Sequence, residues 1–473
     1  MRDVIFSLFV LGMVPACFKK PFIGLAMFSW LAYMRPQDLT WGFARYQRWS
    51  YLIALVTFIG FVRMRPDRWF MANWRSYLML VFMLLVGISV ALSERPEEVQ
   101  FTKYLEFCKI IIIALFTTVA VRTREQLRML LWIIALSLGF YGVKSGIWGF
   151  FSLFRTPIIR GPGGMMLDNN DLSLALSMAV PVLLHLGLTE QKKMVRRAFL
   201  VAVPLTMITI MLTHSRGGFL SLSAALGVMI WHSRNRIAVF SAAAFLGLVA
   251  IALLPASYRD RIASIGAYKT EGSAQGRLHS WRVGYHMAIG NPLFGVGMNK
   301  YRQHFLEYDP SPTPDLLAGQ NIIVAHNSYI QIWAESGSLA LGIYFVLLLS
   351  SFVTIWRVRM QARTRYFTSW ILNYATMFQA SMLSFMVGGT FLNRAHFDLV
   401  YEFLALIMVF AKLAFDEMDD LERYPVREGL RGQLVAVKPR VFGRVPVGFG
   451  RGFRTRPQPA PGGARRLPLS ELR

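Results

Sequence analysis

The chain has 473 residues, of which 55% are hydrophobic, and a mean hydropathy of +0.42, which is too apolar for a soluble protein of this length. A net charge of +25 would indicate nucleic-acid binding in a soluble protein. Here the basic residues stand in short connections between apolar runs, so the positive-inside rule accounts for most of them and no nucleic-acid partner is expected. The composition therefore predicts an all-α polytopic membrane protein.

Apolar runs recur along the chain at membrane-spanning length and predict about 12 or 13 transmembrane helices. The first two runs are short and could form a hairpin that does not fully cross, so we take a bundle of about 12 helices as the expected fold. The runs are centred near residues 10, 28, 57, 85, 115, 136, 179, 205, 224, 247, 346, 381 and 407.

Clusters of arginine and lysine fall on every second connection and mark one side of the bundle as cytoplasmic. The opposite side carries one large loop. The last segment is rich in Arg, Pro and Gly and is expected to be disordered. The predicted divisions are N-terminal transmembrane helices over 1–256, a large periplasmic loop over 257–325, C-terminal transmembrane helices over 326–415 and a basic cytoplasmic tail over 416–473.

Within the large loop, Arg277–Ile289 is predicted to be an amphipathic helix that ends at Asn291-Pro292. We expect this helix to lie across the mouth of the membrane domain. Its apolar face is predicted from residues at helical spacing, namely Leu278, Trp281, Tyr285 and Ala288.

Arginines near a bilayer surface are costly unless they have an anionic partner, which makes two segments candidates for anion binding. Arg216 stands in THSRGG (213–218), where the glycines permit close backbone approach and positive φ, so that backbone amides and the guanidinium could face the same anion. The alternative is an arginine that reaches to lipid headgroups. Arg277 and Arg282 stand in GRLHSWR (276–282). They lie about 140° apart around a helix, so one would contact a ligand while the other anchors the loop. Arg277 is expected to begin the helix, where exposed amides favour an anion.

His326 opens the segment HNSYIQIWAESGSLALG (326–342) and precedes two capping residues, Asn327 and Ser328. This order places an imidazole at the outer membrane surface, where it can accept a proton at neutral pH. The alternative is a histidine that is only hydrogen-bonded at a helix end. Glu335 lies on the opposite helix face and is expected to join a polar seam with Gln331.

Three further residues are candidates for substrate binding. Lys109 and Lys144 would reach an anionic lipid pyrophosphate from within the bundle. Asn170, in the Gly-rich segment GPGGMMLDNNDLS (161–173), would contact a sugar hydroxyl, although helix capping explains the polar residues there as well.

We expect no metal and no cofactor. Cys17 and Cys108 lie in apolar segments and are expected to be small core residues. The patterns HExxH, CxxC, Walker A and GxGxxG do not appear in a suitable context. ATP is therefore not expected as the energy source, and the substrate must arrive already activated.

These segments resemble the O-antigen ligase and polymerase superfamily of bacterial inner-membrane proteins. The resemblance covers about residues 1–415 and is most specific in Arg277–Gly297 (GR, W, NPLFGVG) and His326–Gly342 (HN, then E-x-G and LG). The N-terminal PFIGLAMFSWLAYMRPQDLTWGFARYQRWS further resembles the O-glycosylation ligases found near exosortase systems. The closest functional match is with the lipopolysaccharide O-antigen ligases, often called WaaL.

The resemblance implies a reaction, its partners and its location. Such ligases take a glycan from undecaprenyl pyrophosphate at the periplasmic face and join it to a sugar of the lipid A-core. It implies an inverting, metal-independent transfer by a multi-pass protein of the bacterial inner membrane, with its active site facing the periplasm and in contact with membrane lipids. The key histidine and two arginines correspond to His326, Arg216 and Arg277, with Arg282 as the alternative second arginine.

Three alternatives stay open on sequence grounds. An O-antigen polymerase would transfer the glycan to a second lipid-linked glycan, and a protein O-glycosylation ligase would transfer it to Ser or Thr. The same residues would serve all three acceptors. A membrane transporter is the rival from another class, but such proteins usually show matched halves and ionisable residues near the bilayer midplane, and no convincing internal repeat is evident.

Overall fold

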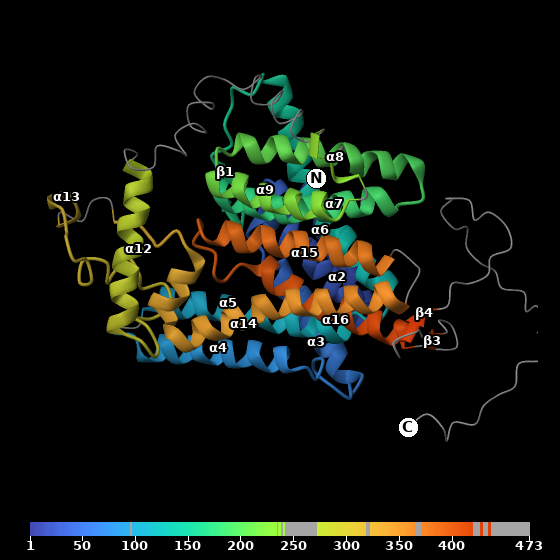
Figure 1. The fold of residues 1–473 in the computed structure, drawn as a ribbon, viewed down its shortest axis with the longest axis horizontal. Coiled ribbons are helices and arrows are strands. Elements are labelled where there is room, and N and C mark those ends of the chain that lie inside the picture. Colours follow the sequence, from blue (N-terminus) through green and yellow to red (C-terminus); the bar gives the residue numbers. More distant parts are fainter. Residues whose placement is uncertain are drawn as a thin grey trace, which may run out of the picture. The chain divides into compact units, whose positions relative to one another are not determined.

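A computed structural model describes residues 1–94, 97–233, 235–237, 240–241, 272–317, 322–365, 370–419, 426–428 and 434–436 (Figure 1). Within these residues the chain is mostly helical, which confirms the predicted all-α class. The predicted span near residue 247, the first part of the predicted loop and most of the predicted tail lie outside the described residues. In the tail, the structure describes one antiparallel pair of short strands, β3 (Val426–Glu428) and β4 (Leu434–Ala436).

The N-terminal elements run from the first residue to the α8–α9 connection. They are α1 (Arg2–Lys19), α2 (Pro21–Tyr33), the 3-10 turns η1 (Pro36–Leu39) and η2 (Phe43–Tyr46), α3 (Trp49–Arg63), α4 (Trp74–Leu92), α5 (Glu98–Ala120), α6 (Arg124–Phe151), the hairpin β1 (Arg160–Gly163) and β2 (Met166–Asp168), α7 (Asn169–Thr189) and α8 (Lys193–Leu212). The later helices are α9 (Arg216–Trp231), α12 (Gly272–Gly290), α13 (Pro314–Leu317), α14 (Ser328–Arg365), α15 (Trp370–Gly389) and α16 (Asp398–Met418).

Five of the described helices are long and apolar enough to cross a membrane, namely α4, α6, α7, α8 and α14. Three others, α2, α3 and α9, are apolar but have only 10–17 residues. The protein is therefore a multi-pass membrane protein, as its composition predicts. The expected number of about 12 spans stays a prediction.

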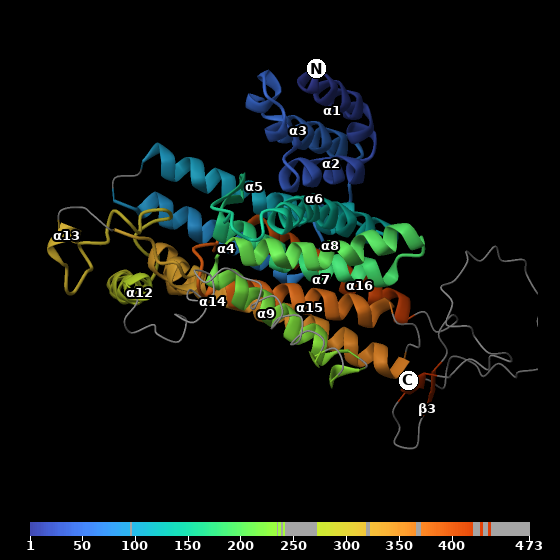
Figure 2. The ribbon, with the colours of Figure 1, turned by 90° about the horizontal axis from the view of Figure 1, so that it is seen from above.

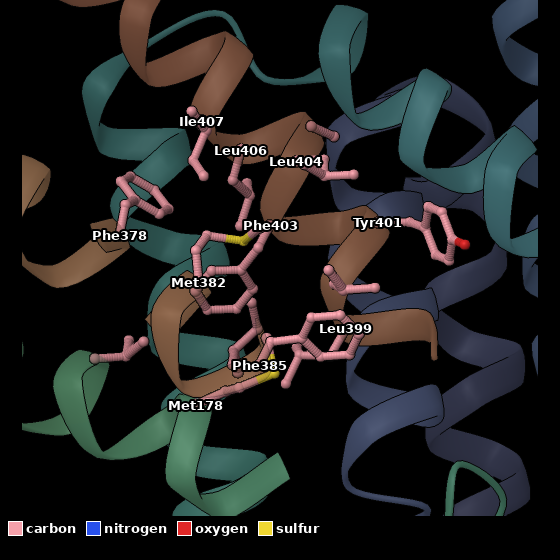
Figure 3. Packing of buried hydrophobic residues seen from close by; sticks show 14 of the residues in the cluster. Met178, Phe378, Met382, Phe385, Leu399, Tyr401, Phe403, Leu404, Leu406 and Ile407 are labelled. Carbon is pink, nitrogen blue, oxygen red and sulfur yellow. The ribbon is translucent and has the colours of Figure 1, made fainter. Parts of the chain in front are cut away.

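Two helices occupy the centre of the main bundle. α7 packs against α6, α8, α9 and α15 and is buried along most of its length, while α16 packs against α5, α14 and α15. Their side chains meet those of α15 in a dense apolar core that includes Met178, Phe378, Phe385 and Phe403 (Figure 3). Because interiors of this kind are closely packed, the core holds the ends of these helices in fixed positions.

The short helices α1–α3 have a second core of their own, which includes Phe6, Val10, Trp49 and Ile53. The carboxylate of Asp3 connects α1 to the segment after α2, since it accepts hydrogen bonds from the backbone N–H groups of Gly42 and Ala44. α2 then packs against α6 and joins the unit to the main bundle.

α12 crosses one end of the bundle, as expected for the predicted loop helix. It stands across the direction of α14 and α15 in one view and is seen nearly end-on in the other (Figures 1 and 2). It packs against the first part of α14. The helix ends at Gly290, immediately before Asn291-Pro292, as the sequence predicts.

The buried face of α12 differs from the predicted one. Ala288 is fully buried as predicted and so are Val283 and Met287, whereas Leu278 and Tyr285 are 43% and 47% exposed. The reason is that α12 packs on both its own loop and α14, since Tyr301, Phe305 and Ala334 form a separate small core with it. The helix also begins at Gly272, so Arg277 lies in its second turn and not at the exposed amides of its start.

The segment NPLFGVG (291–297) explains why α14 is not one straight helix. α14 breaks at Gly337, whose backbone has φ 85° and ψ 175°. The loop inserts at this break: the N–H of Ser338 donates to the carbonyl of Pro292 (2.8 Å) and the N–H of Val296 donates to the carbonyl of Ala334 (2.9 Å). The loop therefore takes up backbone groups that the interrupted helix leaves unpaired.

Candidate functional site at the α12 end of the bundle

His326 directly precedes α14 and has a left-handed backbone, with φ 45°. Asn327 caps α14, because its Oδ1 accepts the N–H groups of Tyr329 (2.9 Å) and Ile330 (3.1 Å). The sequence predicted this cap, and it fixes where the imidazole enters the site.

α12 holds the strand-like segment that leads into His326. The indole N–H of Trp281 donates to the carbonyl of Ala325 (2.8 Å), and the hydroxyl of Ser280 donates to the carbonyl of Val324 (3.1 Å). These two bonds attach the residues just before His326 to the helix that carries Arg277. The position of His326 relative to α12 is therefore set by hydrogen bonds from two α12 side chains to the backbone just before His326.

The charges around His326 come from two other elements. Burial lowers the pKa of His326 below its usual value, the positive charge of Arg277 on α12 lowers it further, and the negative charge of Asp168 before α7 raises it. The imidazole is half-buried and is affected by charges of both signs. A group of this kind stays neutral at neutral pH and can take up a proton.

Arg277 and Arg282, which the sequence could not separate, lie in different surroundings. Arg277 is half-buried and acts electrostatically on His326. Arg282 is exposed on another face of α12. Only Arg277 is thus brought to the imidazole, as expected from the separation of about 140° around the helix.

Arg216 is the first residue of α9, and its neighbours connect it to α7. The hydroxyl of Ser215 caps α9 by accepting the N–H of Gly218 (3.1 Å), and it donates to Oδ1 of Asn170 (2.7 Å). Asn170 therefore lies at this cluster, as part of the protein's own hydrogen bonding. Its expected contact with a sugar hydroxyl stays a prediction.

The expected conformation of the turn before α9 was wrong in one respect. The glycines have helical backbone, and the positive φ (55°) belongs to His214. Their role is close packing: a Cβ on Gly218 would lie 2.3 Å from the Ser173 hydroxyl oxygen, and one on Gly217 would lie 3.1 Å from Cβ of Phe391. Small residues let the start of α9 approach α7 and the α15–α16 connection.

Arg394, in the α15–α16 connection, is a site residue that the sequence analysis missed. Its guanidinium forms an ion pair with the buried carboxylate of Asp171 through Nε and Nη2, and its backbone N–H donates to the hydroxyl of Ser328 (3.0 Å). Asp171 and Asp168 also form a reciprocal capping box at the start of α7. A lone arginine in a connection gives no sequence signal for such a long-range pair.

Three helix N-termini converge here, those of α7, α9 and α14. Each N-terminus carries a partial positive charge that favours an anion. Arg277 acts electrostatically on His326 and Arg216 begins α9, and both carry a guanidinium, a group whose geometry matches phosphate. The arrangement has the chemistry of a site for a phosphate-bearing ligand beside a proton acceptor.

The hairpin β1–β2 leads into this cluster and is contacted by the N-terminal region. Arg35, which has a left-handed backbone and pairs with Asp38, lies against the tip of the hairpin. A Cβ on Gly164 would be 2.2 Å from Nη1 of Arg35. The Gly-rich sequence thus allows Arg35 to pack directly on the hairpin backbone.

The two candidate lysines lie away from this cluster. Lys109, on α5, donates to the phenol oxygen of Tyr51 on α3 and sits over that ring at 4.3 Å. Lys144, on α6, is exposed. The structure does not bring either of them to His326, and their role in binding a lipid pyrophosphate stays a prediction. Among the described residues, no three His, Cys, Asp or Glu side chains gather as metal ligands would.

Comparison with known families identifies this region. Residues 199–345 match the model of a family described as O-antigen ligase. This match supports the predicted relation to the O-antigen ligase and polymerase superfamily. The match includes the three key residues that the resemblance implied: Arg216, Arg277 and His326.

Residues 1–153 match a second model, a family of unknown function. That part of the chain supplies α1–α6, and with them Arg35 beside the hairpin. No curated protein matches the chain. Members of the family that matches residues 199–345 are glycosyltransferase-like ligases or polymerases.

Proposed function

We propose that this protein is an O-antigen ligase. It would transfer a glycan from undecaprenyl pyrophosphate to a sugar of the lipid A-core oligosaccharide, in an inverting and metal-independent reaction at the periplasmic face of the bacterial inner membrane. The observation that carries the proposal is that His326, inside the region that matches the O-antigen ligase family, is half-buried and is affected by the opposite charges of Arg277 and Asp168.

In the proposed reaction, His326 acts as the general base. A hydroxyl of the acceptor sugar attacks the anomeric carbon of the donor glycan from the face opposite the pyrophosphate. The hydroxyl proton passes to His326, a new C–O bond forms, and the bond between the anomeric carbon and the pyrophosphate oxygen breaks. General-base assistance of this kind contributes roughly 10²–10⁴-fold to the rate.

Arg216 and Arg277 hold the leaving group in this proposal. Undecaprenyl pyrophosphate departs as an anion, and guanidiniums that remain charged stabilise the negative charge that develops on its oxygens. The N-terminus of α9, where Arg216 stands, adds to this stabilisation. The half-buried Arg277 is favoured over the exposed Arg282 as the second arginine.

Asp168 has a supporting role in the same proposal. Once His326 has taken the proton, it becomes an imidazolium next to the positive charge of Arg277. The negative charge of Asp168 offsets this repulsion, which is the sense in which it raises the pKa of His326. The protonated intermediate state is thus stabilised without a second proton transfer.

The decisive experiment is transfer by the purified protein in detergent or nanodiscs. The donor is a glycan on undecaprenyl pyrophosphate, offered separately with lipid A-core, with a second lipid-linked glycan and with a Ser/Thr-containing protein, and mass spectrometry identifies the product. A parallel reaction contains a chelator. His326→Ala should abolish transfer, while His286→Ala, an exposed histidine on α12, should leave it unchanged.

Each outcome of this experiment decides between functions. A product on lipid A-core, formed with chelator present, supports the ligase. A product only on the second glycan would identify a polymerase, and one only on Ser or Thr would identify a protein ligase. Movement of the donor across proteoliposomes without any new glycosidic bond would identify a transporter. Full activity of His326→Ala would remove the general-base assignment.

A further inference from the structure

A cavity of about 560 Å³ lies at the end of the bundle opposite to His326. Three elements form it: the α3–α4 connection, the C-terminal end of α5 and the last turns of α16. Along α16, Lys412 at this cavity is 14 residues from Asp398 at the other end, which corresponds to about 21 Å of helix. The cavity is therefore separate from the site around His326.

Positively charged side chains outnumber negatively charged ones in the lining of this cavity. Its lining includes Arg68, Arg122 and Lys412 against a single carboxylate, that of Asp67. Among the described residues, Arg68 has no carboxylate partner, and Arg122 uses its Nε to donate to a backbone carbonyl at 3.1 Å. Lys412 is paired with Asp416. Two guanidiniums are thus available for an anion at one opening.

Apart from Thr118, the rest of the lining is apolar, which favours an anion that carries an apolar part. Phe70, Val119, Val409 and Leu413 form this part of the wall. A free phosphate ion would gain nothing from such a wall, whereas a phospholipid would place its glycerol and the first part of its acyl chains there. Basic pockets between helices at the cytoplasmic side of membrane proteins are typical sites for anionic headgroups.

The connection that closes the cavity is fixed in place. The N–H of Met71 donates to the hydroxyl of Thr118 (2.9 Å), which attaches the connection to α5. Next to it, the ring of Trp69 packs edge-on against that of Phe61 at 5.9 Å. The cavity is consequently built by tertiary contacts of the folded protein and is not a gap beside a loose loop.

We propose that this cavity binds the phosphate headgroup of an anionic phospholipid from the leaflet at the basic end of the bundle. Arg68 and Arg122 bind the phosphate oxygens, Lys412 adds positive charge at the rim, and the apolar wall receives the glycerol backbone. Lipid binding here is independent of glycan transfer, because the two sites lie at opposite ends of α16.

The test is native mass spectrometry of the full-length protein in non-ionic detergent, titrated with phosphatidylglycerol and, separately, with phosphatidylcholine. The variant R68A/R122A removes the two guanidiniums. K193A/R197A is the matched control, since both residues are exposed at the start of α8, near the same end of the bundle and outside the cavity. Inorganic phosphate and glycerol 3-phosphate are added as soluble competitors. The variant R68K/R122K retains the positive charges, and its lipid binding is measured in place of that of R68A/R122A if the alanine variant does not fold.

We expect wild type to prefer phosphatidylglycerol over phosphatidylcholine. R68A/R122A should weaken binding by about 25-fold, since each basic residue near an anionic headgroup contributes roughly 5-fold, while K193A/R197A should bind as wild type does. R68K/R122K should retain most of the affinity. Equal losses in the two alanine variants, equal binding of both lipids, or full competition by the soluble phosphates would overturn the proposal, the last by identifying a free-phosphate site.

Discussion

Gly337 and Leu293 are in direct backbone contact, where the NPLFGVG loop enters the break in α14. A Cβ on Gly337 would lie 2.1 Å from the carbonyl oxygen of Leu293, and the φ of Gly337 is 85°, where side chains are rarely accommodated. The contact ties the end of α12 to the helix that begins just after His326. The relative position of Arg277 and His326 therefore depends on a glycine at residue 337.

We predict that Gly337→Ala destabilises the protein strongly. Backbone strain and overpacking would together cost roughly 2–6 kcal/mol, enough to lower the unfolding temperature in detergent by many degrees or to prevent folding. Gly342→Ala is the control on the same helix, because nothing lies within 4 Å of its added Cβ. Fluorescence-detected thermal unfolding measures both. Equal stability of the two variants would show that the loop does not need this contact.

The charges around His326 predict a specific pH dependence of transfer. The reactive form of His326 is the neutral imidazole, so the rate falls as pH drops through its pKa. Burial and Arg277 lower that pKa below 6.5, so the decrease in transfer rate should occur below pH 6.5. Arg277→Ala removes a positive charge, which raises the pKa and moves the fall to higher pH. Asp168→Asn removes a negative charge and moves it to lower pH.

The exposed Arg282 supplies the control for this pH profile. Arg282→Ala should leave the position of the fall unchanged, whereas Arg277→Ala should also slow transfer at high pH by roughly 10²–10³-fold, as for the loss of a group that stabilises developing charge. Initial rates measured across pH at saturating donor give both quantities. A shift in the same direction for Arg277→Ala and Asp168→Asn would contradict the assignment of His326 as the titrating base.

Trp281 is expected to act as a positioning residue. Trp281→Phe keeps an aromatic ring but removes the hydrogen bond to the carbonyl of Ala325, whose loss costs about 1 kcal/mol. Transfer should slow by about 10-fold through kcat, with the unfolding temperature nearly unchanged. Trp333→Phe removes a comparable indole bond, to the hydroxyl of Ser338, at a place away from His326. Equal effects of the two variants on kcat would argue against a specific role of Trp281.

The sequence was sufficient for the features that depend on local pattern. Apolar runs predicted the helices, Asn291-Pro292 predicted the end of α12, and Asn327 predicted the cap of α14. These signals act over a few residues along the chain. They are strong because a helix in a membrane must satisfy its own backbone groups.

Features that depend on packing between distant segments could not be predicted from local sequence pattern. The buried face of α12 was only partly predicted because its partners include loop residues such as Tyr301 as well as residues of α14. The positive φ was expected at the glycines and is found at His214, since the glycines serve close packing against α7. Arg394 was missed because its partner Asp171 is more than 200 residues away.

Among the polar residues at this end of the bundle, we expect substitution of Arg394, which pairs with Asp171, to cause the largest loss of folding stability. Asp171 has a side chain that is 3% exposed, so Arg394→Ala leaves a buried carboxylate without its partner. Removing one member of a buried pair costs roughly 3–5 kcal/mol; because the side chain of Arg394 is 32% exposed, water would reduce this cost toward the lower limit.

Arg394→Lys should recover only part of that stability, since an ammonium group cannot contact both carboxylate oxygens as the guanidinium does. The double variant D171N/R394A should be more stable than Arg394→Ala alone, because the asparagine carries no charge that needs a partner. Arg155→Ala, an exposed arginine near the start of the β1–β2 hairpin, is the control. Thermal unfolding in detergent measures the four variants, and a double variant less stable than Arg394→Ala would mean that the two side chains act independently.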